Sequence, residues 1–353
     1  MKKLIGNRLK MARHRAGLNL RDLGKKIGIS AQAISKYERG LNVPGSDILL
    51  RLSEALGVKA EYFFRTTPIQ SFHPVYRKKS CLRLKDERAI IAQIRDWLER
   101  YLKIEALYDL DESYRLPEKL RIAREEDLEE AALHLRKNWS LGLGPVENLI
   151  ETLEMNGIKV GRIDGHRDFE SCTFSMDNTR PVIVVKKDVP GDRQRFSLAH
   201  ELGHLVLELP GSMDTEKAAN RFAGAFLVPR DAVLAELGEK RKSLNPFELY
   251  LLKHKYGLSM LGWLHRAEDL AVISGATAKR MVERFRRKGW NLKEPGNQIE
   301  PEKTERMTRL VFRALEEKII TESKASELLR QPLDAFYRNE SKQHGEFPID
   351  IRN

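Results

Sequence analysis

The segment FSLAHELGHLVLE, residues 196–208, contains His200 and His204 four positions apart, with Glu201 directly after the first histidine. An α-helix turns about 100° per residue, so the two imidazoles would lie on one face and could bind the same metal ion. Glu201 would project near the same side, where its carboxylate could take a proton from water as a general base. The spacing is that of an HExxH metal site, and the alternative is an ordinary amphipathic helix with two surface histidines.

The apolar residues around the two histidines favour the metal site. Five of them would bury most of this helix: Phe196, Leu198, Ala199, Leu202 and Leu205. Two histidines inside a buried helix would be costly without partners. The Val- and Ile-rich segment PVIVVKK precedes the helix and predicts a strand. We therefore expect a metal-binding helix next to a small sheet.

A catalytic zinc ion needs a third protein ligand and one open position. The segment EKAANRFAGAFLVP, residues 216–229, predicts a second amphipathic helix that begins at Glu216. Glu216 is the main candidate for the third ligand, and Asn220, one turn later, could orient a ligand by a hydrogen bond. The alternative for Glu216 is a carboxylate that interacts favourably with the dipole of its helix. Glu208 and Asp214 are further candidate ligands.

The spacing of residues does not identify those that would stabilise an oxyanion. Four side chains after the second helix could donate a hydrogen bond to one, although a structural role is the simpler explanation for each of them. These residues are Tyr250, His254, Tyr256 and His265.

A basic block precedes the metal motif. Residues 1–65 contain 14 Lys and Arg against 5 Asp and Glu, which accounts for +9 of the net charge of +12. A basic block of domain size favours a nucleic-acid partner over a merely soluble surface. Helical periodicity, with Gly28 and Gly40 as stop signals, predicts several short helices over residues 4–64.

The segment LRDLGKKIGISAQAISKYERG, residues 20–40, resembles the helix-turn-helix of Xre (Cro/CI-like) repressors. The resemblance implies that the helix after Gly28 enters the major groove of duplex DNA. Gln32 could bond bidentately to adenine, Lys36 could meet guanine or a phosphate, and Arg39 could meet the backbone. The alternative is a solvated helix face. The candidate DNA contacts are Ser30, Gln32, Ser35, Lys36 and Arg39.

Two further positions bear on this resemblance. Arg13 and Glu38 match a buried ion pair of the Xre fold, which joins the first helix to the end of the third. Leu20 departs from the pattern, because family members often carry there a Gln that touches phosphate. The departure puts one backbone contact in doubt and leaves the fold prediction unchanged.

The two helical segments of the metal motif resemble the ImmA/IrrE family of metallopeptidases, which pairs HExxH with a following E-x-x-x-N-x-F-A. The resemblance covers roughly residues 125–285. It implies a Zn²⁺ ion held by His200, His204 and Glu216, with Glu201 as general base. It also implies a protein substrate, a transcriptional repressor encoded nearby, that is cut in response to stress, phage or mobile-element signals.

These patterns predict an α+β fold that is mainly helical. We expect a helix-turn-helix domain over residues 1–65, and a linker with a long connector helix over residues 66–120. A zincin-like metallopeptidase domain would cover residues 121–290, followed by a C-terminal helical segment over residues 291–353. The C-terminal segment is similar to the tail of other Xre regulators fused to an ImmA/IrrE domain.

Composition excludes several classes of protein. The chain has 353 residues, of which 32% are charged and 41% hydrophobic, as expected for a globular protein. Two distant cysteines, Cys81 and Cys172, argue against a disulfide framework or a thiolate metal site. Neither a signal peptide nor a membrane span is visible, so we expect a cytoplasmic protein with no membrane partner. A homodimer through residues 85–110 is a further possibility.

Three functions remain open from the sequence. The first is a DNA-tethered zinc endopeptidase that cleaves a regulatory protein. The second is a DNA-binding transcriptional regulator whose metal domain is structural or sensory. The third is one component of a toxin–antitoxin or phage-defence locus. The presence of Glu201 favours the first, because a purely structural metal site needs no base.

Overall fold

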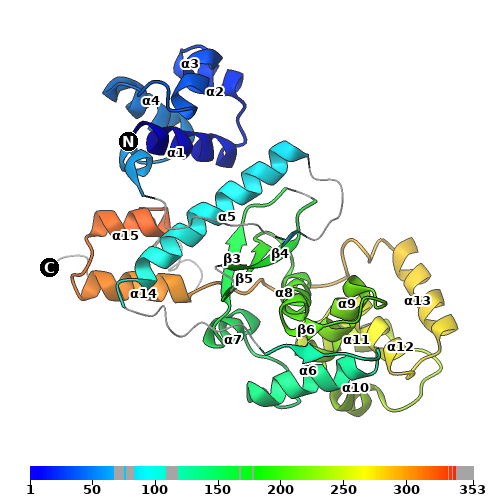
Figure 1. The fold of residues 1–353 in the computed structure, drawn as a ribbon. Coiled ribbons are helices and arrows are strands. Elements are labelled where there is room, and N and C mark those ends of the chain that lie inside the picture. Colours follow the sequence, from blue (N-terminus) through cyan, green and yellow to red (C-terminus); the bar gives the residue numbers. More distant parts are fainter. Residues whose placement is uncertain are drawn as a thin grey trace. The chain divides into compact units, whose positions relative to one another are not determined.

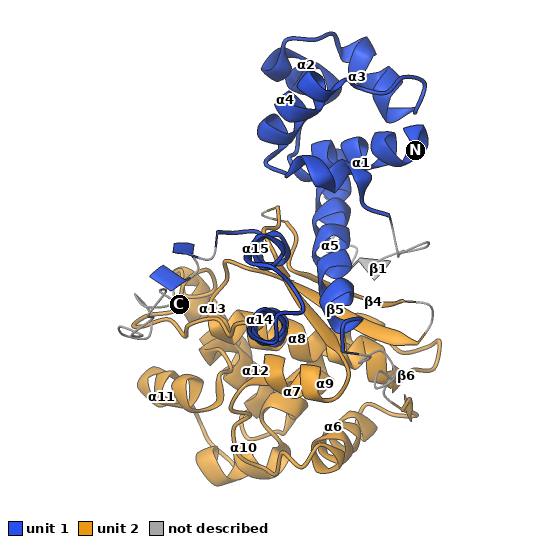
Figure 2. Ribbon diagram, turned by 90° about the vertical axis from the view of Figure 1, so that its left-hand side faces the viewer, with its two compact units in different colours: residues 1–70, 83–113, 305–353 blue, residues 71–82, 114–304 orange. Residues whose placement is uncertain are grey.

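The computed structural model describes residues 1–66, 75–76, 83–108, 118–166, 168–176, 179–332, 334–335 and 337–338. They form a mainly helical α+β fold, as the sequence predicts (Figure 1). The chain divides into two compact units (Figure 2): the first contains residues 1–70, 83–113 and 305–353, and the second residues 71–82 and 114–304. Most of the predicted linker between residues 66 and 82, and the end of the C-terminal segment, lie outside the described residues.

The first unit begins with four α-helices and one 3-10 helix. Local signals fix the second and third helices: the side chain of Asn19 caps the start of α2, Gly28 ends it with φ 70°, and Ser30 caps α3. Gly24 of α2 allows the turn between α2 and α3 to pass close to the backbone of α2. A Cβ at this position would lie only 2.6 Å from the carbonyl oxygen of Ile29. The elements are α1 (Lys2–Arg15), α2 (Leu20–Ile27), α3 (Ala31–Glu38), α4 (Ser46–Leu56) and η1 (Ala60–Phe64).

Apolar side chains from all these elements form one core. Burying an aliphatic or aromatic side chain contributes about 1.5–3 kcal/mol, so this core can stabilise five short helices that would not persist alone. Its buried members are Ile5, Leu9, Ala12, Leu23, Ile27, Ile34, Leu52, Leu56, Tyr62 and Phe63.

Three later helices belong to the same unit. They are α5 (Leu84–Glu105), α14 (Arg306–Glu316) and α15 (Glu322–Leu329). The long helix α5 contacts α1, α14 and α15, and buried Arg8 of α1 donates a hydrogen bond to Glu99 of α5. The predicted connector helix and the C-terminal helices are thus packed with the N-terminal module.

The second unit contains a four-stranded sheet in the order β1-β4-β5-β3. β3 and β5 run parallel, whereas β4 is antiparallel to both of its neighbours. Val182 to Val185 of β5 are completely buried, which explains the continuous apolar run of this strand. The strands are β1 (Val75–Tyr76), β3 (Lys159–Ile163), β4 (Ser171–Met176) and β5 (Arg180–Lys186).

Helices pack against this sheet and against one another. α8 (Gly191–Val206) contacts β4 and β5, and it packs along α9 (Thr215–Leu227). The remaining elements are β2 (Leu120–Arg121), α6 (Asp127–Asn138), α7 (Leu149–Met155), β6 (Leu207–Glu208), α10 (Arg230–Leu237), α11 (Pro246–Tyr256), α12 (Met260–Asp269) and α13 (Gly275–Arg287). Among the described residues, no helix has both the length and the apolar character needed to cross a membrane.

The segment after α13 returns to the start of α8. The amide of Gly191 donates to the carbonyl oxygen of Ile299 at 2.7 Å, and a Cβ at Gly191 would lie 2.4 Å from the carbonyl oxygen of Glu300. Buried Glu294 accepts hydrogen bonds from Lys253 and from the first amides of α12. Residues 291–304, which the sequence assigns to the C-terminal segment, therefore belong to the second unit.

The close turn at Gly24 gives a first prediction. Gly24→Ala should destabilise the N-terminal module by about 1–3 kcal/mol, because its Cβ would collide with backbone. Gly144→Ala is the control: no atom lies within 4 Å of its added Cβ, so its effect should stay within about 0.5 kcal/mol. Urea unfolding followed by circular dichroism measures both, and equal midpoints for the two variants would contradict the predicted collision.

Candidate metal centre and DNA-binding surface

His200, His204 and Glu216 converge in the second unit. The Nε2 atoms of the two histidines lie 2.9 Å apart. The carboxylate of Glu216 lies 3.3 Å from Nε2 of His204 and 3.6 Å from Nε2 of His200. Among the residues that the structure describes, this is the one group of three His, Cys, Asp or Glu side chains whose ligand atoms all lie within 4.8 Å of one another.

The donor set and its spacing fit a zinc ion. Two imidazoles and one carboxylate form a common catalytic zinc site, and bond lengths of about 2.0–2.2 Å place neighbouring ligand atoms roughly 3–3.5 Å apart. His200 Nδ1 lies 2.8 Å from Asn220 Oδ1. Donation of the Nδ1 proton to this amide oxygen leaves Nε2 of His200 free of a proton and able to bind a metal.

The three side chains of the candidate metal centre differ in their exposure to solvent. His200 is completely buried, whereas the side chain of His204 is 24% exposed and that of Glu216 is 52% exposed. One side of the group is therefore open to solvent, as a catalytic site requires. Two candidate ligands lie elsewhere: Asp214 caps α9 through the amides of Glu216 and Lys217, and Glu208 lies 3.3 Å from Arg121.

Glu201 is buried beside His200 on α8, with only 1% of its surface exposed. Its Oε1 accepts a hydrogen bond of 2.6 Å from the hydroxyl of Ser171 on β4. Burial, and to a smaller extent the charge of Glu201, raises the pKa of the Cys172 thiol well above its ordinary value. Cys172 thus stays protonated. Ser171 was not predicted from the sequence, where its only signal is a polar residue at the start of an apolar strand.

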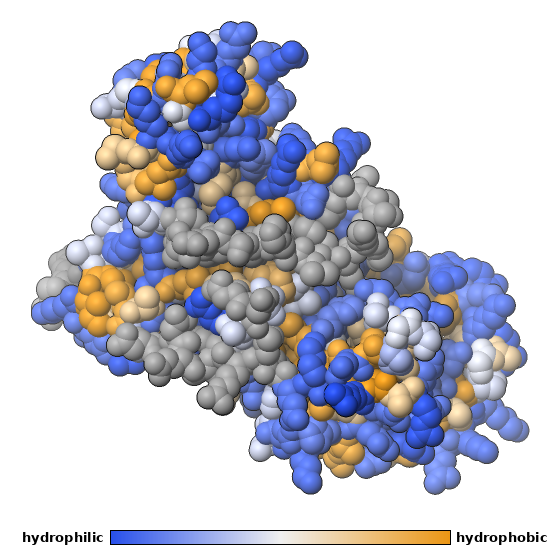
Figure 3. All heavy atoms as spheres, in the orientation of Figure 1, coloured by the Kyte–Doolittle hydropathy of each residue, from blue (hydrophilic) through white to orange (hydrophobic). Residues whose placement is uncertain are grey.

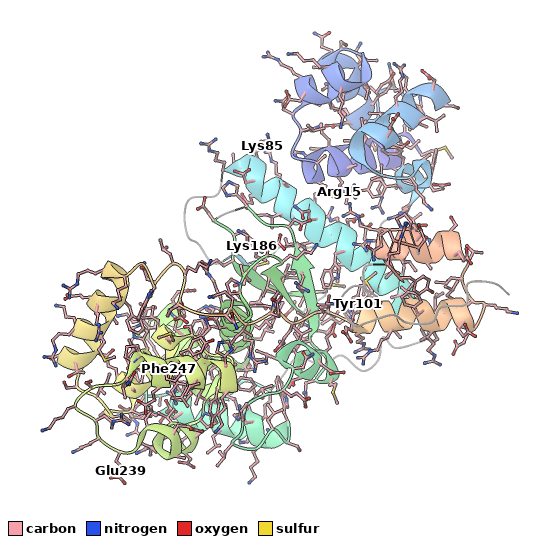
Figure 4. All side chains as sticks on the ribbon, turned by 180° about the vertical axis from the view of Figure 1, so that it is seen from behind. Arg15, Lys85, Tyr101, Lys186, Glu239 and Phe247 are labelled. Atoms are coloured by element: carbon pink, nitrogen blue, oxygen red, sulfur yellow. The ribbon has the colours of Figure 1, made fainter. Side chains whose placement is uncertain are left out.

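A cavity of about 590 Å³ shares Asn220 with the candidate metal centre. Among the four residues considered for oxyanion stabilisation, His265 lines this cavity. Tyr256 instead donates a hydrogen bond to Glu236, and burial together with this bond raises the pKa of Tyr256 to about 12. Tyr250 packs between the rings of Phe247 and His254. Figure 4 labels Phe247 on α11.

The candidate DNA contacts lie on and beside α3. Ser30, Gln32, Lys36 and Arg39 are exposed, and Ser35 is half-buried. Gln32 and Lys36 are one turn apart and therefore share a face of the helix. The hydroxyl oxygen of Ser30 accepts the amide hydrogen of Ala33, so this residue caps the helix. Figure 3 shows that much of the described surface is hydrophilic in this view.

Arg13 and Glu38 form a bidentate ion pair that joins α1 to the end of α3. Nε and Nη2 of Arg13 lie 2.6 and 2.8 Å from the two carboxylate oxygens, and only 8% and 7% of the two side chains are exposed. Nη1 of Arg13 also donates to the carbonyl oxygen of Leu18. Leu20 packs against the apolar core, which explains an apolar residue at this position.

Two stretches of the chain match known families. Residues 156–268 match the IrrE N-terminal-like domain, and residues 9–63 match a helix-turn-helix domain. The two matches lie in separate stretches of the chain.

Curated relatives match a short stretch of the chain. Over 64 residues the chain is 36% identical to an uncharacterized HTH-type transcriptional regulator of Sinorhizobium medicae (strain WSM419), which is 18% of this chain and 46% of that protein. Over 58 residues it is 38% identical to the HTH-type transcriptional regulator ImmR of Bacillus subtilis (strain 168), which is 16% of this chain and 46% of ImmR. The matches thus span less than half of each of these relatives.

Among solved structures, a Mycobacterium tuberculosis transcriptional regulator aligns with a TM-score of 0.30 and 19% identity, over 47% of this chain and 51% of that chain.

The ion pair of the N-terminal module gives a second prediction. Arg13→Ala should destabilise this module by about 3–5 kcal/mol, because Glu38 would remain buried without its partner. Native-state hydrogen exchange of amides in residues 1–65 measures the loss. The exposed Arg39 offers a control: Arg39→Ala should change protection by less than about 0.5 kcal/mol. Unchanged protection in Arg13→Ala would show that the pair contributes nothing.

Proposed function

We propose that the chain is a DNA-binding transcriptional regulator that also acts as a zinc-dependent endopeptidase, and that it cleaves a repressor encoded nearby. The observation that carries the proposal is the convergence of His200, His204 and Glu216 next to the buried carboxylate of Glu201. A structural zinc site is closed by four protein ligands and needs no adjacent base, whereas a catalytic site keeps a position open.

The side chains divide into holding and proton-transfer roles. His200, His204 and Glu216 would hold the ion. When bound, a zinc ion would polarise a peptide carbonyl and make water more acidic. Glu201 takes the proton of the attacking water on a carboxylate oxygen and gives it to the leaving amine. Ser171 is a positioning residue, since its hydrogen bond fixes the orientation of this carboxylate.

Two further features support the proposed endopeptidase. Oδ1 of Asn220 lies 2.8 Å from Nδ1 of His200, and a hydrogen bond there would favour the tautomer whose Nε2 can bind a metal ion. The cavity next to Asn220 is lined by both apolar and polar side chains, among them Phe196, Met213 and His265. Such a lining suits the side chain of a bound polypeptide better than a small inorganic substrate.

The DNA-binding part of the proposal rests on α3. Its exposed face presents Gln32 and Lys36 one turn apart, and in this kind of module the second helix of the motif lies in the major groove. Binding of two half-sites would require a homodimer. We propose that the module brings the endopeptidase to the operator where the repressor substrate is also bound.

Measurements of metal content and of cleavage distinguish the proposed metal ligands from the proposed general base. Glu216→Ala and His204→Ala should lose most of the zinc of the purified protein, because each removes one ligand. Glu201→Gln should keep about one zinc per chain and lose cleavage by about 10²–10⁴-fold, because an amide cannot accept the proton. Elemental analysis and a cleavage assay on the purified product of the neighbouring repressor gene provide the two readouts.

Glu208→Ala is the matched control, because Glu208 is an acidic residue on β6, directly after α8, and lies outside the group. It should keep both zinc and cleavage. Loss of zinc in Glu201→Gln but not in Glu216→Ala would refute the ligand assignment. Full cleavage by Glu201→Gln would refute the endopeptidase, and leave a regulator whose metal domain is structural or sensory.

Sequence readout by α3 is tested on DNA. Gln32→Ala should weaken binding to an operator selected in vitro by about 1–3 kcal/mol and leave binding to random DNA unchanged. Lys36→Ala, if its partner is a phosphate, should weaken binding to both and lower the salt dependence by about one ion. Gel shifts over a salt series compare the variants. If Gln32→Ala lost equal affinity for the operator and for random DNA, Gln32 would be excluded from sequence readout.

A further inference from the structure

Four arginines of the first unit surround one buried carboxylate, that of Asp96 on α5. Oδ1 of Asp96 lies 3.5 Å from Arg15 and 3.9 Å from Arg65, and Oδ2 lies 3.4 Å from Arg100 and 3.5 Å from Arg330. Hydrogen-bonded pairs of this kind are about 2.7–2.9 Å apart. Within the described residues, neither Oδ2 of Asp96 nor Nε of Arg100 makes a hydrogen bond, although both atoms are buried.

A cavity of about 520 Å³ adjoins this cluster, and all five residues of the cluster line it. The other charged residues of its wall are Lys59, Glu54 and Glu327. Glu327 is already paired, at 2.6 Å with Arg65 and 3.0 Å with Lys324, and Glu54 is exposed. The wall therefore has five positive and three negative groups, and its positive charge is only partly neutralised.

The charges in this cavity are poorly stabilised. Burial lowers the pKa of Arg100 to about 10. Burial, followed by the charge of Arg330, also lowers the pKa of Arg15. Each shift means that the cationic form is less favourable here than in water. Additional negative charge in the cavity would offset this cost.

We propose that this cavity binds a small organic anion with two or more carboxylate or phosphate groups. Guanidinium groups match both kinds of oxyanion through paired hydrogen bonds. The volume is within the range of pockets for small organic ligands, about 300–1,000 Å³. Tyr62 gives the cavity an aromatic wall, with Arg15 and Arg65 at 5.9 and 5.1 Å from its ring centroid.

The walls come from two parts of the first unit. Arg15 ends α1 and Arg65 follows η1, whereas Asp96 and Arg100 belong to α5, and Arg330 follows α15. Figure 4 labels Arg15 on α1 and Tyr101 on α5. An anion that bonds to arginines from both parts would hold the DNA-binding module to α5 and α15. The site is separate from the candidate metal centre, which lies in the second unit.

Calorimetric titration of the full chain tests the proposal. Tricarballylate, a tricarboxylate, and fructose 1,6-bisphosphate are the two probes, with acetate as the monovalent control at the same ionic strength. At least one probe should bind saturably at one site per chain, and the stronger one identifies carboxylate or phosphate as the recognised group. Binding of neither probe above the acetate level would overturn the proposal.

Two matched arginine variants locate the site. Arg330→Gln changes a half-exposed arginine of the cluster and should weaken binding about tenfold or more, since a charged hydrogen bond is lost. Arg313→Gln changes an arginine of α14 that is similarly exposed but pairs with Glu317, and it should bind as the parent does. Equal affinity of the two variants would overturn the assignment. Glu216→Ala, titrated in parallel, should bind normally, and loss of binding there would place the anion at the metal centre instead.

Discussion

The close approach of α8 and α9 is the constraint on which the candidate metal centre depends. Gly203 makes it possible, because a Cβ at this position would lie 3.1 Å from the ring of Phe222 and 3.3 Å from Cα of Ala219. With no side chain there, one turn of α9 lies against one turn of α8. Glu216 then reaches the two histidines, and Asn220 reaches Nδ1 of His200 from the same turn. Glu216, the candidate third ligand, and Asn220, which bonds to His200, are thus both placed by one helix contact.

Burial of this contact favours partners for its polar groups, because an unpaired buried group costs about 1–3 kcal/mol. His200 bonds to Asn220, and Glu201 bonds to Ser171 of β4. At the start of α8, Asp192 lies 3.1 Å from the buried ammonium of Lys253, which also bonds to Glu294. Bonds to β4, to α9 and to the segment after α13 therefore fix α8 along its length. A helix held in this way keeps its side chains in one geometry, which the proposed proton transfer by Glu201 requires.

Features that depend on local spacing could be predicted from the sequence. The mainly helical α+β class, the helix-turn-helix and the IrrE-like domain are confirmed, because helical periodicity and the HExxH spacing involve only neighbouring turns. Ser171 could not be predicted, since its place beside Glu201 depends on the pairing of β4 with β5, in which Ser171 lies opposite Val185. The return of residues 294–302 to α8, and the packing of α5 with α1 through Arg8 and Glu99, depend on contacts between residues about 100 positions apart. Single-sequence patterns contain no signal for such contacts.

The basic charge of the N-terminal module is only partly available to DNA. Its net charge of +9 suggests many phosphate contacts, but Arg8, Arg13, Arg15 and Arg65 are all buried against carboxylates of the same unit. Three of these partners, Glu99, Asp96 and Glu327, lie outside residues 1–65. The net charge counted over residues 1–65 alone therefore overstates the positive charge that the folded unit presents. Salt dependence of DNA binding follows the phosphates that are contacted rather than the net charge. Arg8, Arg15 and Arg65 connect the module to α5 and α15, so part of the basic charge of this sequence serves to assemble the first unit.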